Sequence, residues 1–204
     1  MKIVVGGPPR SGKSVLLKAI RQAIGAIPGA PYCYVVTACP DGEGSWYQET
    51  VHKTPELAAE LKAAHKSKFT WEFAETAALW VQNCHLPLTL VDLGGIVDGK
   101  NELIARHASH AILLASREED FEVWREFCTK LSLRLIAELV SDHHSAEDHV
   151  SGVGADGVLR GVIHHLERGE DASDRPVVVS LARYILDQVS NQGPTPGGLD
   201  TEAS

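Results

Sequence analysis

Short runs of apolar and β-branched residues alternate along the chain with stretches in which apolar residues recur every three or four positions. The first run, Lys2 to Gly6, predicts a strand, and the apolar spacing of residues 14–26 predicts the helix that follows it. The same patterns predict later strands at 32–38, 86–93, 111–115 and 133–140, and helices from Thr54 and at 72–83, 101–107, 118–131 and 176–189. Strands that alternate with helices are typical of a mainly parallel sheet with helices on both faces.

The second half of the chain adds two features to this pattern. Residues 154–165 predict one or two further strands. The end of the chain is rich in Gly, Pro, Thr and acidic residues, which is typical of a disordered segment. We therefore expect one α/β domain at residues 1–190 and a disordered C-terminal tail at residues 191–204.

Composition limits the classes of partner. The 204 residues are 44% hydrophobic and 23% charged, as in an ordinary globular domain. The formal net charge of −8 gives no bulk attraction to nucleic acid, which leaves open a local site for a short oligonucleotide or a phosphorylated metabolite. No apolar run reaches the roughly 20 residues that cross a bilayer, and no signal-peptide pattern stands at the N-terminus. We expect a cytoplasmic protein without a membrane partner.

The segment between the first strand and the first helix carries a complete G-x-x-x-x-G-K-S motif at residues 7–14. In such a P-loop, backbone N–H groups and the following helix N-terminus surround phosphates, Lys13 bridges the β- and γ-phosphates, and the Ser14 hydroxyl binds Mg²⁺. The motif predicts a three-layer P-loop NTPase fold that binds ATP and Mg²⁺. The residues expected to contact the nucleotide are Gly7, Pro8, Pro9, Arg10, Ser11, Gly12, Lys13, Ser14, Val15 and Arg117.

A later strand supplies the metal partner that such a loop needs. Residues 88–92 read Leu-Thr-Leu-Val-Asp, four apolar or β-forming residues before a carboxylate, which is a Walker B pattern. We expect Asp92 to hold a water on Mg²⁺, and Gly94 and Gly95 to let the chain pass close to the γ-phosphate. The alternative is an Asp that caps a turn at the strand end. The sequence thus predicts Ser14 and Asp92 as metal residues. The predicted catalytic residues are Lys13 and Asp92, together with Asp41 of the loop after the second predicted strand.

Two motifs that are absent from the chain limit the classes of P-loop protein to which it could belong. Hydrolytic ATPases of the AAA and helicase type usually carry a glutamate directly after the Walker B aspartate, and Leu93 stands there. The guanine-binding N-K-x-D motif is also absent, since residues 141–144 read Ser-Asp-His-His. Both a strong hydrolytic motor and a conventional small GTPase are disfavoured, and P-loop kinases and dimeric ATPases are favoured.

The acceptor side of a P-loop kinase lies above the strand ends, beside the P-loop. The loop after the second predicted strand holds Asp41 and Glu43, either of which could orient an acceptor hydroxyl or take its proton. Trp46 and Tyr47 follow and could stack on a base, while packing is the plainer role. Arg117 stands at the end of the fourth strand, beside the expected nucleotide.

Cysteines and histidines give weaker signals. Four cysteines without a C-x-x-C pair disfavour a zinc knuckle and favour reduced, mostly buried thiols. The pairs at 143–144 and 164–165 are poor chelates because neighbouring side chains in a strand face opposite ways. A metal cluster of Asp142, His143 and Asp148 can be drawn, but its spacing is not diagnostic.

Several segments together resemble a known group, the AAA-like P-loop domain fused to, or encoded beside, the ring nuclease of type III CRISPR systems. The segments are residues 6–14 (GGPPRSGKS), 38–44 (ACPDGEG), 91–95 (VDLGG), 124–128 (WREFC) and 161–169 (GVIHHLERG). The resemblance implies antiviral signalling, a nucleotide or short oligonucleotide ligand and a ring-nuclease partner, and names no reaction.

Three functions stay open on the sequence. The first is a kinase-like phosphotransferase that acts on a nucleotide or a nucleic-acid end. The second is an ATP-dependent switch that controls assembly with a partner or as a homo-oligomer. The third is a metallochaperone-like NTPase, for which the Gly-Gly-Pro before the P-loop and the histidines are the motivation.

Overall fold

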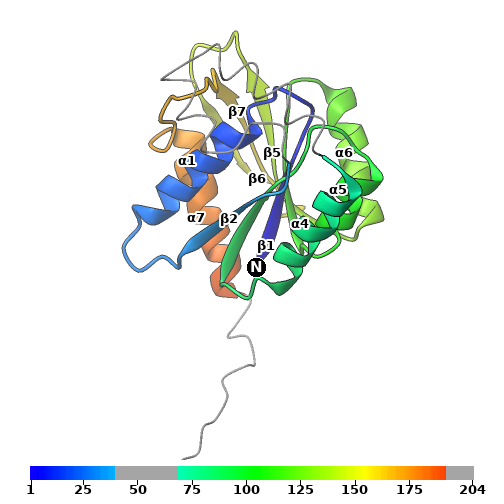
Figure 1. The fold of residues 1–204 in the computed structure, drawn as a ribbon. Coiled ribbons are helices and arrows are strands. Elements are labelled where there is room, and N and C mark those ends of the chain that lie inside the picture. Colours follow the sequence, from blue (N-terminus) through cyan, green and yellow to red (C-terminus); the bar gives the residue numbers. More distant parts are fainter. Residues whose placement is uncertain (40–68, 192–204) are drawn as a thin grey trace, which may run out of the picture.

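The computed structural model describes residues 1–39 and 69–191 of the chain. The strands in this part are β1 (Lys2–Gly6), β2 (Cys33–Thr37), β3 (Leu88–Asp92), β4 (His110–Ala115), β5 (Arg134–Asp142), β6 (His149–Val153) and β7 (Leu159–His164). The helices are α1 (Lys13–Gly25), α4 (Trp71–Asn83), α5 (Gly99–Ala105), α6 (Glu118–Lys130) and α7 (Pro176–Asn191). All of these elements join one domain (Figure 1).

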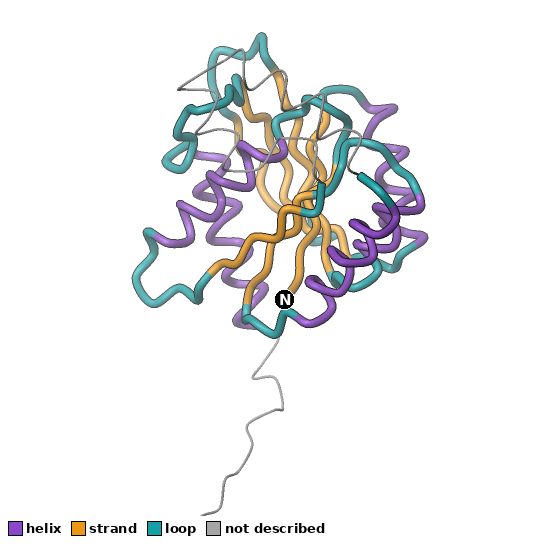
Figure 2. Tube along the Cα trace, in the orientation of Figure 1, coloured by secondary structure: helices purple, strands orange, loops and turns teal. Residues whose placement is uncertain are grey.

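The strands form one seven-stranded sheet in the order β2-β3-β1-β4-β5-β7-β6. Each neighbouring pair is parallel except β7 and β6, which form an antiparallel hairpin. Helices α1 and α7 cover one face of the sheet, and α4, α5 and α6 cover the other (Figures 1 and 2). The predicted α/β architecture with a mainly parallel sheet and helices on both faces is confirmed.

Two apolar layers hold the helices on the sheet. One layer joins the inward side of α1 and α7 to the sheet. Its α1 members include the six apolar positions at helical spacing, Val15, Leu16, Ala19, Ile20, Ala23 and Ile24, and also Leu17, which that spacing did not indicate. The other layer packs α4, α5 and α6 against the opposite face. Every residue of β3 is buried, as expected for a strand covered on both sides. No helix among the described residues is long and apolar enough to span a membrane.

The end of the sheet differs in part from the prediction. One strand of the hairpin, β7, lies within the predicted range 154–165, but β6 precedes that range at His149–Val153. β6 is an edge strand whose residues are exposed or half-buried, and it contains His, Ser and Gly among two valines. It therefore lacks the apolar alternation by which a half-buried strand is detected. The helix predicted from Thr54 and the acidic loop at 41–43 lie outside the described residues.

The parallel register brings three loops to one edge of the sheet. Val5 pairs with Asp92, and Gly6 pairs with Leu113, so β1, β3 and β4 end side by side. The segments that follow them, residues 7–12, 93–98 and 116–117, therefore meet at the carboxyl edge of the sheet. Ligands of open α/β sheets bind at this edge.

Candidate functional site

The loop of residues 7–12 between β1 and α1, which we call the glycine-rich loop, has a backbone that demands glycine. Gly7 has φ +148°, Gly12 has φ +95°, and Arg10 between them has φ +65°. A Cβ on Gly7 would lie 2.0 Å from the backbone oxygen of Leu114. A side chain at Gly7 is thus excluded both by the left-handed backbone and by the neighbouring strand.

Lys13 turns back into this loop. Its side chain is only 3% exposed, and its Nζ donates to the carbonyl oxygens of Gly7 at 2.9 Å and Pro8 at 2.8 Å. These bonds draw the first residues of the loop around the ammonium group. The buried charge is therefore oriented by the chain itself at the start of α1.

The N-terminus of α1 is left uncapped by any side chain. Its N-cap residue, Gly12, has no side-chain acceptor, and the first turn of α1 contains no acidic residue. Most helices satisfy their first N–H groups with a Ser, Thr, Asp or Asn side chain, as Thr70 and Asp98 do for α4 and α5. An uncapped helix start with its positive dipole end suits an anion.

Two oxygen groups meet where β3 ends. The Ser14 hydroxyl donates to Asp92 Oδ2 at 2.7 Å, and the Asp92 side chain is almost wholly buried. The pairing of Val5 with Asp92 positions the carboxylate beside the glycine-rich loop. A hydroxyl and a carboxylate are hard oxygen ligands of the kind that Mg²⁺ prefers, so the donor set fits this ion.

The loop also encloses a hydroxyl that its own residues do not use. Ser11 Oγ is buried and has no hydrogen-bond partner among the described residues. Buried hydroxyls in native proteins nearly always have a partner. The glycine-rich loop thus carries one more hydrogen-bond donor than the described chain satisfies, which fits a loop built around an additional acceptor.

A buried amide holds the loop that follows β3. Asn101 in α5 is 1% exposed, accepts from Gly94 N at 3.1 Å and donates to the Ile96 carbonyl at 2.6 Å. These bonds hold the loop in which Gly95 lies against the glycine-rich loop. The approach is close, since a Cβ on Gly95 would lie 2.5 Å from Pro9 N. The two loops are therefore in backbone contact, and no side chain fits between them.

Beside these loops lies a cleft of about 730 Å³. Its walls come from residues 8–10 of the glycine-rich loop, from residues 94–96, 98, 100 and 101, and from residues 116, 117 and 120, with Cys39 and Phe69. Arg117 lines this cleft, next to the loop as expected, and it is bound to Asp120 through Nε at 2.9 Å and Nη2 at 3.0 Å. The hydrogen bond and charge of Asp120 raise the pKa of Arg117.

The other residues expected at the site are distributed as follows. Val15 is 5% exposed and its side chain packs in the core, so only its backbone belongs to the start of α1. Asp41, Glu43 and the aromatic pair at 46–47 lie outside the described residues. Sequence patterns did not indicate a site role for Asn101, Lys100 or Phe69, because no motif connects them to the loop; the only local signal was the helix predicted at 101–107.

The histidines near the ends of β5 and β7 bind a carboxylate and one another. The buried carboxylate of Asp148 accepts from His164 through both its ring Nδ1 at 2.6 Å and its backbone N at 3.0 Å. The rings of His143 and His165 make an edge-to-face contact at 5.7 Å. Among the described residues, no three His, Cys, Asp or Glu side chains gather into a metal-binding group. The cluster drawn from Asp142, His143 and Asp148 is therefore not assembled.

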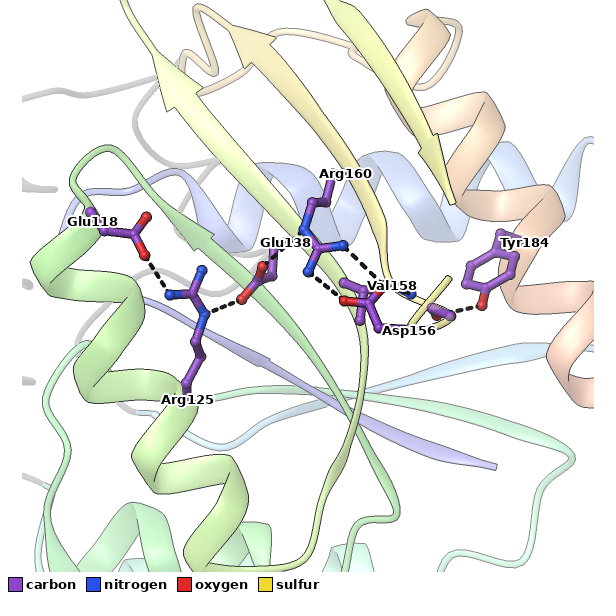
Figure 3. A network of polar contacts seen from close by, with 8 residues as sticks. Glu118, Arg125, Glu138, Asp156, Val158, Arg160 and Tyr184 are labelled. Atoms are coloured by element: carbon purple, nitrogen blue, oxygen red, sulfur yellow. Dashed lines mark hydrogen bonds and ion pairs between the residues drawn. The ribbon is translucent and has the colours of Figure 1, made fainter. Parts of the chain in front are cut away.

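The cysteines lie in or near the core, and Arg125 and Arg160 form ion pairs within the fold. Cys33, Cys39 and Cys128 are buried, Cys84 is half-buried, and none of these four thiols forms a disulfide within the described part of the chain. Burial raises the pKa of Cys33 to about 11. Figure 3 shows Glu138 of β5 between Arg125 of α6 and Arg160 of β7, a network that ties helix to sheet.

Two of the segments that carry the family resemblance also contact the glycine-rich region. The Trp124 ring lies 2.6 Å from the position that a Cβ on Gly6 would take, and Leu166 Cδ1 lies 2.8 Å from the corresponding position on Gly12. No protein-family profile matches the chain, and no curated protein matches it. The resemblance to the CRISPR-associated P-loop domain, with its ring-nuclease partner, stays a prediction.

Proposed function

We propose that this chain has a P-loop NTPase fold, binds ATP with Mg²⁺ on residues 7–14, and transfers the γ-phosphoryl group to an acceptor. The observation that carries the proposal is the contact of 2.7 Å between the Ser14 hydroxyl and Asp92 Oδ2 at the start of an uncapped helix. The motif predicted these two residues as partners although 78 positions separate them. A turn-capping role for Asp92 does not account for its bond to the first turn of α1.

Each residue of the loop has a task in this proposal. The N–H groups of the loop and of the first turn of α1 bind phosphate oxygens, since no side chain caps the start of α1. The Lys13 ammonium, already held by two carbonyl groups, neutralises phosphate charge. Ser14 and Asp92 would hold Mg²⁺, which supplies charge neutralisation when bound.

Leu93 favours transfer over fast hydrolysis. It stands where a motor ATPase carries a glutamate, and it is 1% exposed within the apolar layer under α4, α5 and α6. A side chain in that environment can neither orient nor deprotonate a water. The cleft next to the loop offers instead the room that an acceptor requires.

The proposed transfer is balanced as follows. An acceptor hydroxyl oxygen forms a bond to the γ-phosphorus, and the bond from that phosphorus to the β–γ bridging oxygen breaks, so that ADP leaves. The hydroxyl proton goes to a carboxylate. Asp41, which lies outside the described residues, stays the predicted base.

The test is incubation of the full chain with γ-labelled ATP, Mg²⁺ and nucleotide or 5′-hydroxyl oligonucleotide acceptors. Label should appear on an acceptor, and the Lys13→Ala variant should lose this transfer. Lys18→Ala, which changes a lysine of the same helix outside the motif, should retain it. Release of free phosphate without any labelled acceptor would contradict the phosphotransferase proposal.

The contact between Gly95 and Pro9 supports a second candidate, a nucleotide-dependent switch. Because Asn101 couples this contact to α5, a change at the glycine-rich loop would reach the surface of that helix. The switch predicts slow turnover and a change in oligomer size on addition of a non-hydrolysable ATP analogue. Light scattering that shows one unchanged mass with and without the analogue would argue against it. The metallochaperone alternative gains no support from the described histidines.

A further inference from the structure

The cleft beside the glycine-rich loop combines charge and apolar surface in a way that the phosphate motif does not explain. Its volume of about 730 Å³ lies in the range of small-molecule sites. Lys13 and Ser14 are not among its lining residues, whereas Pro8, Pro9 and Arg10 are. The cleft is therefore adjacent to the proposed triphosphate site and distinct from its metal-binding end.

Three cations line this cleft on a chain whose formal net charge is −8. They are Arg10, Lys100 and Arg117. The two lining carboxylates are both engaged, because Asp98 Oδ1 caps the first turn of α5 and Asp120 binds Arg117 with both oxygens. The cleft thus holds more positive than negative groups, and its two carboxylates bind groups of the protein itself.

Each cation retains donors for a ligand. Arg117 uses Nε and Nη2 on Asp120, and its Nη1 lies 3.8 Å from the exposed Glu119. Lys100 spends one of its three N–H donors on the Phe69 carbonyl, at 2.7 Å. Among the described residues, no hydrogen bond or ion pair engages the exposed guanidinium of Arg10. Such groups bind phosphate oxygens well.

An apolar surface lies beside these cations. Ile96 is 63% exposed in the cleft, although a side chain of this kind normally packs inside. The Phe69 ring is held in place by an edge-to-face contact with Phe73 at 6.1 Å and by the Lys100 ammonium 4.9 Å from its centre. An oriented aromatic ring and an exposed aliphatic side chain suit a planar heterocycle.

We propose that this cleft binds a nucleoside monophosphate, with the base against Phe69 and Ile96 and the phosphate on Lys100, Arg117 and Arg10. The combination selects this class because an uncharged nucleoside would leave the cations unused and inorganic phosphate would leave the apolar surface unused. A metal cation would be repelled. This inference rests on the proposed function, and it names the acceptor class for the same site.

The test is calorimetric titration of AMP, adenosine and inorganic phosphate into the full chain and its variants. AMP should bind at least tenfold more tightly than either adenosine or phosphate. Lys100→Met and Arg117→Ala should each weaken AMP binding about tenfold or more, since each removes a charged hydrogen bond to phosphate. Arg106→Ala, an exposed arginine at the end of α5 outside the cleft, should change it less than twofold.

The Lys13→Ala variant separates this proposal from the function that it rests on. It should lose Mg²⁺·ATP binding and keep AMP binding within about twofold. Loss of AMP binding in Lys13→Ala, with retention in both cleft variants, would place AMP on the glycine-rich loop and overturn the inference. Equal affinity for AMP and adenosine would also overturn it. Wild-type chain that binds Mg²⁺·ATP but not AMP would refute the cleft and leave triphosphate binding intact.

Discussion

Replacement of Asn101 by alanine tests how the loop after β3 is held. The Asn101 side chain is buried, and it satisfies the Gly94 N–H at 3.1 Å and the Ile96 carbonyl at 2.6 Å. Alanine removes both partners and leaves the buried Gly94 N–H and the part-buried Ile96 carbonyl unpaired. The buried N–H costs about 1–3 kcal/mol when unpaired and the part-buried carbonyl costs about 1 kcal/mol, so we expect a loss of about 2–4 kcal/mol in the free energy of unfolding.

Urea denaturation followed by circular dichroism measures this loss. With a slope of about 3 kcal/mol per molar urea for a domain of this size, the midpoint should fall by about 1 M while the slope stays unchanged. The Asn101→Asp variant tests the two bonds individually. It keeps the acceptor for Gly94 N, but it replaces the donor to the Ile96 carbonyl by a carboxylate oxygen. It should destabilise at least as much as alanine.

Asn83→Ala, at the exposed end of α4, is the matched control and should stay within about 0.5 kcal/mol of wild type. The Asn101→Ala variant should also bind Mg²⁺·ATP more weakly, because Gly95 is no longer held against Pro9. An Asn101→Ala protein with wild-type midpoint and wild-type nucleotide affinity would refute the role of Asn101 in holding the loop after β3.

Three further predictions concern single positions. Gly7→Ala should destabilise the chain by more than about 3 kcal/mol and abolish triphosphate binding, because its Cβ would lie 2.0 Å from the Leu114 backbone oxygen; thermal unfolding and calorimetry measure both. Gly25→Ala, at the end of α1 with open space around the Cβ position, should instead stabilise by about 0.5–1 kcal/mol in urea; destabilisation would mean that this position resists a side chain. Burial lowers the pKa of His110 from 6.5 to about 4, so its neutral form contributes stability above pH 6.5 that is lost as pH falls toward 4. His110→Gln should flatten the pH dependence of unfolding in that window, where wild type has a limiting slope of about 1.4 kcal/mol per pH unit from this group; parallel profiles would contradict the assignment.

Much of the fold follows from local patterns in the sequence. The range predicted for β1 agrees with the structure, and α1 begins within one residue of its predicted start because its apolar residues recur at helical spacing. β6 could not be predicted in this way, since it is held by pairing with β7 and its exposed positions, His149, Ser151 and Val153, do not follow an apolar alternation. Edge strands of this type are specified by tertiary contacts.

The site residues likewise fall into those that a motif indicated and those that only the structure shows. The G-x-x-x-x-G-K-S motif indicated Lys13 and Ser14, and the apolar run before Asp92 indicated their partner across the sheet. Asn101 and Lys100 act through side-chain bonds to backbone groups, Asn101 to Gly94 at a separation of 7 residues and Lys100 to Phe69 at a separation of 31. No residue pattern indicates such contacts, so the bonds of Asn101 to the loop after β3 and the cleft could be identified only from the structure.

The most direct measurement of the central claim is the Mg²⁺ dependence of ATP affinity in wild type and in Ser14→Ala and Asp92→Asn. If Ser14 and Asp92 hold the metal, wild type should bind ATP at least tenfold more tightly with Mg²⁺ than with EDTA. Both variants should lose most of that difference and remain folded. Equal affinity with and without Mg²⁺ in wild type, or an unchanged Mg²⁺ effect in both variants, would contradict the assignment of this loop as a magnesium–triphosphate site.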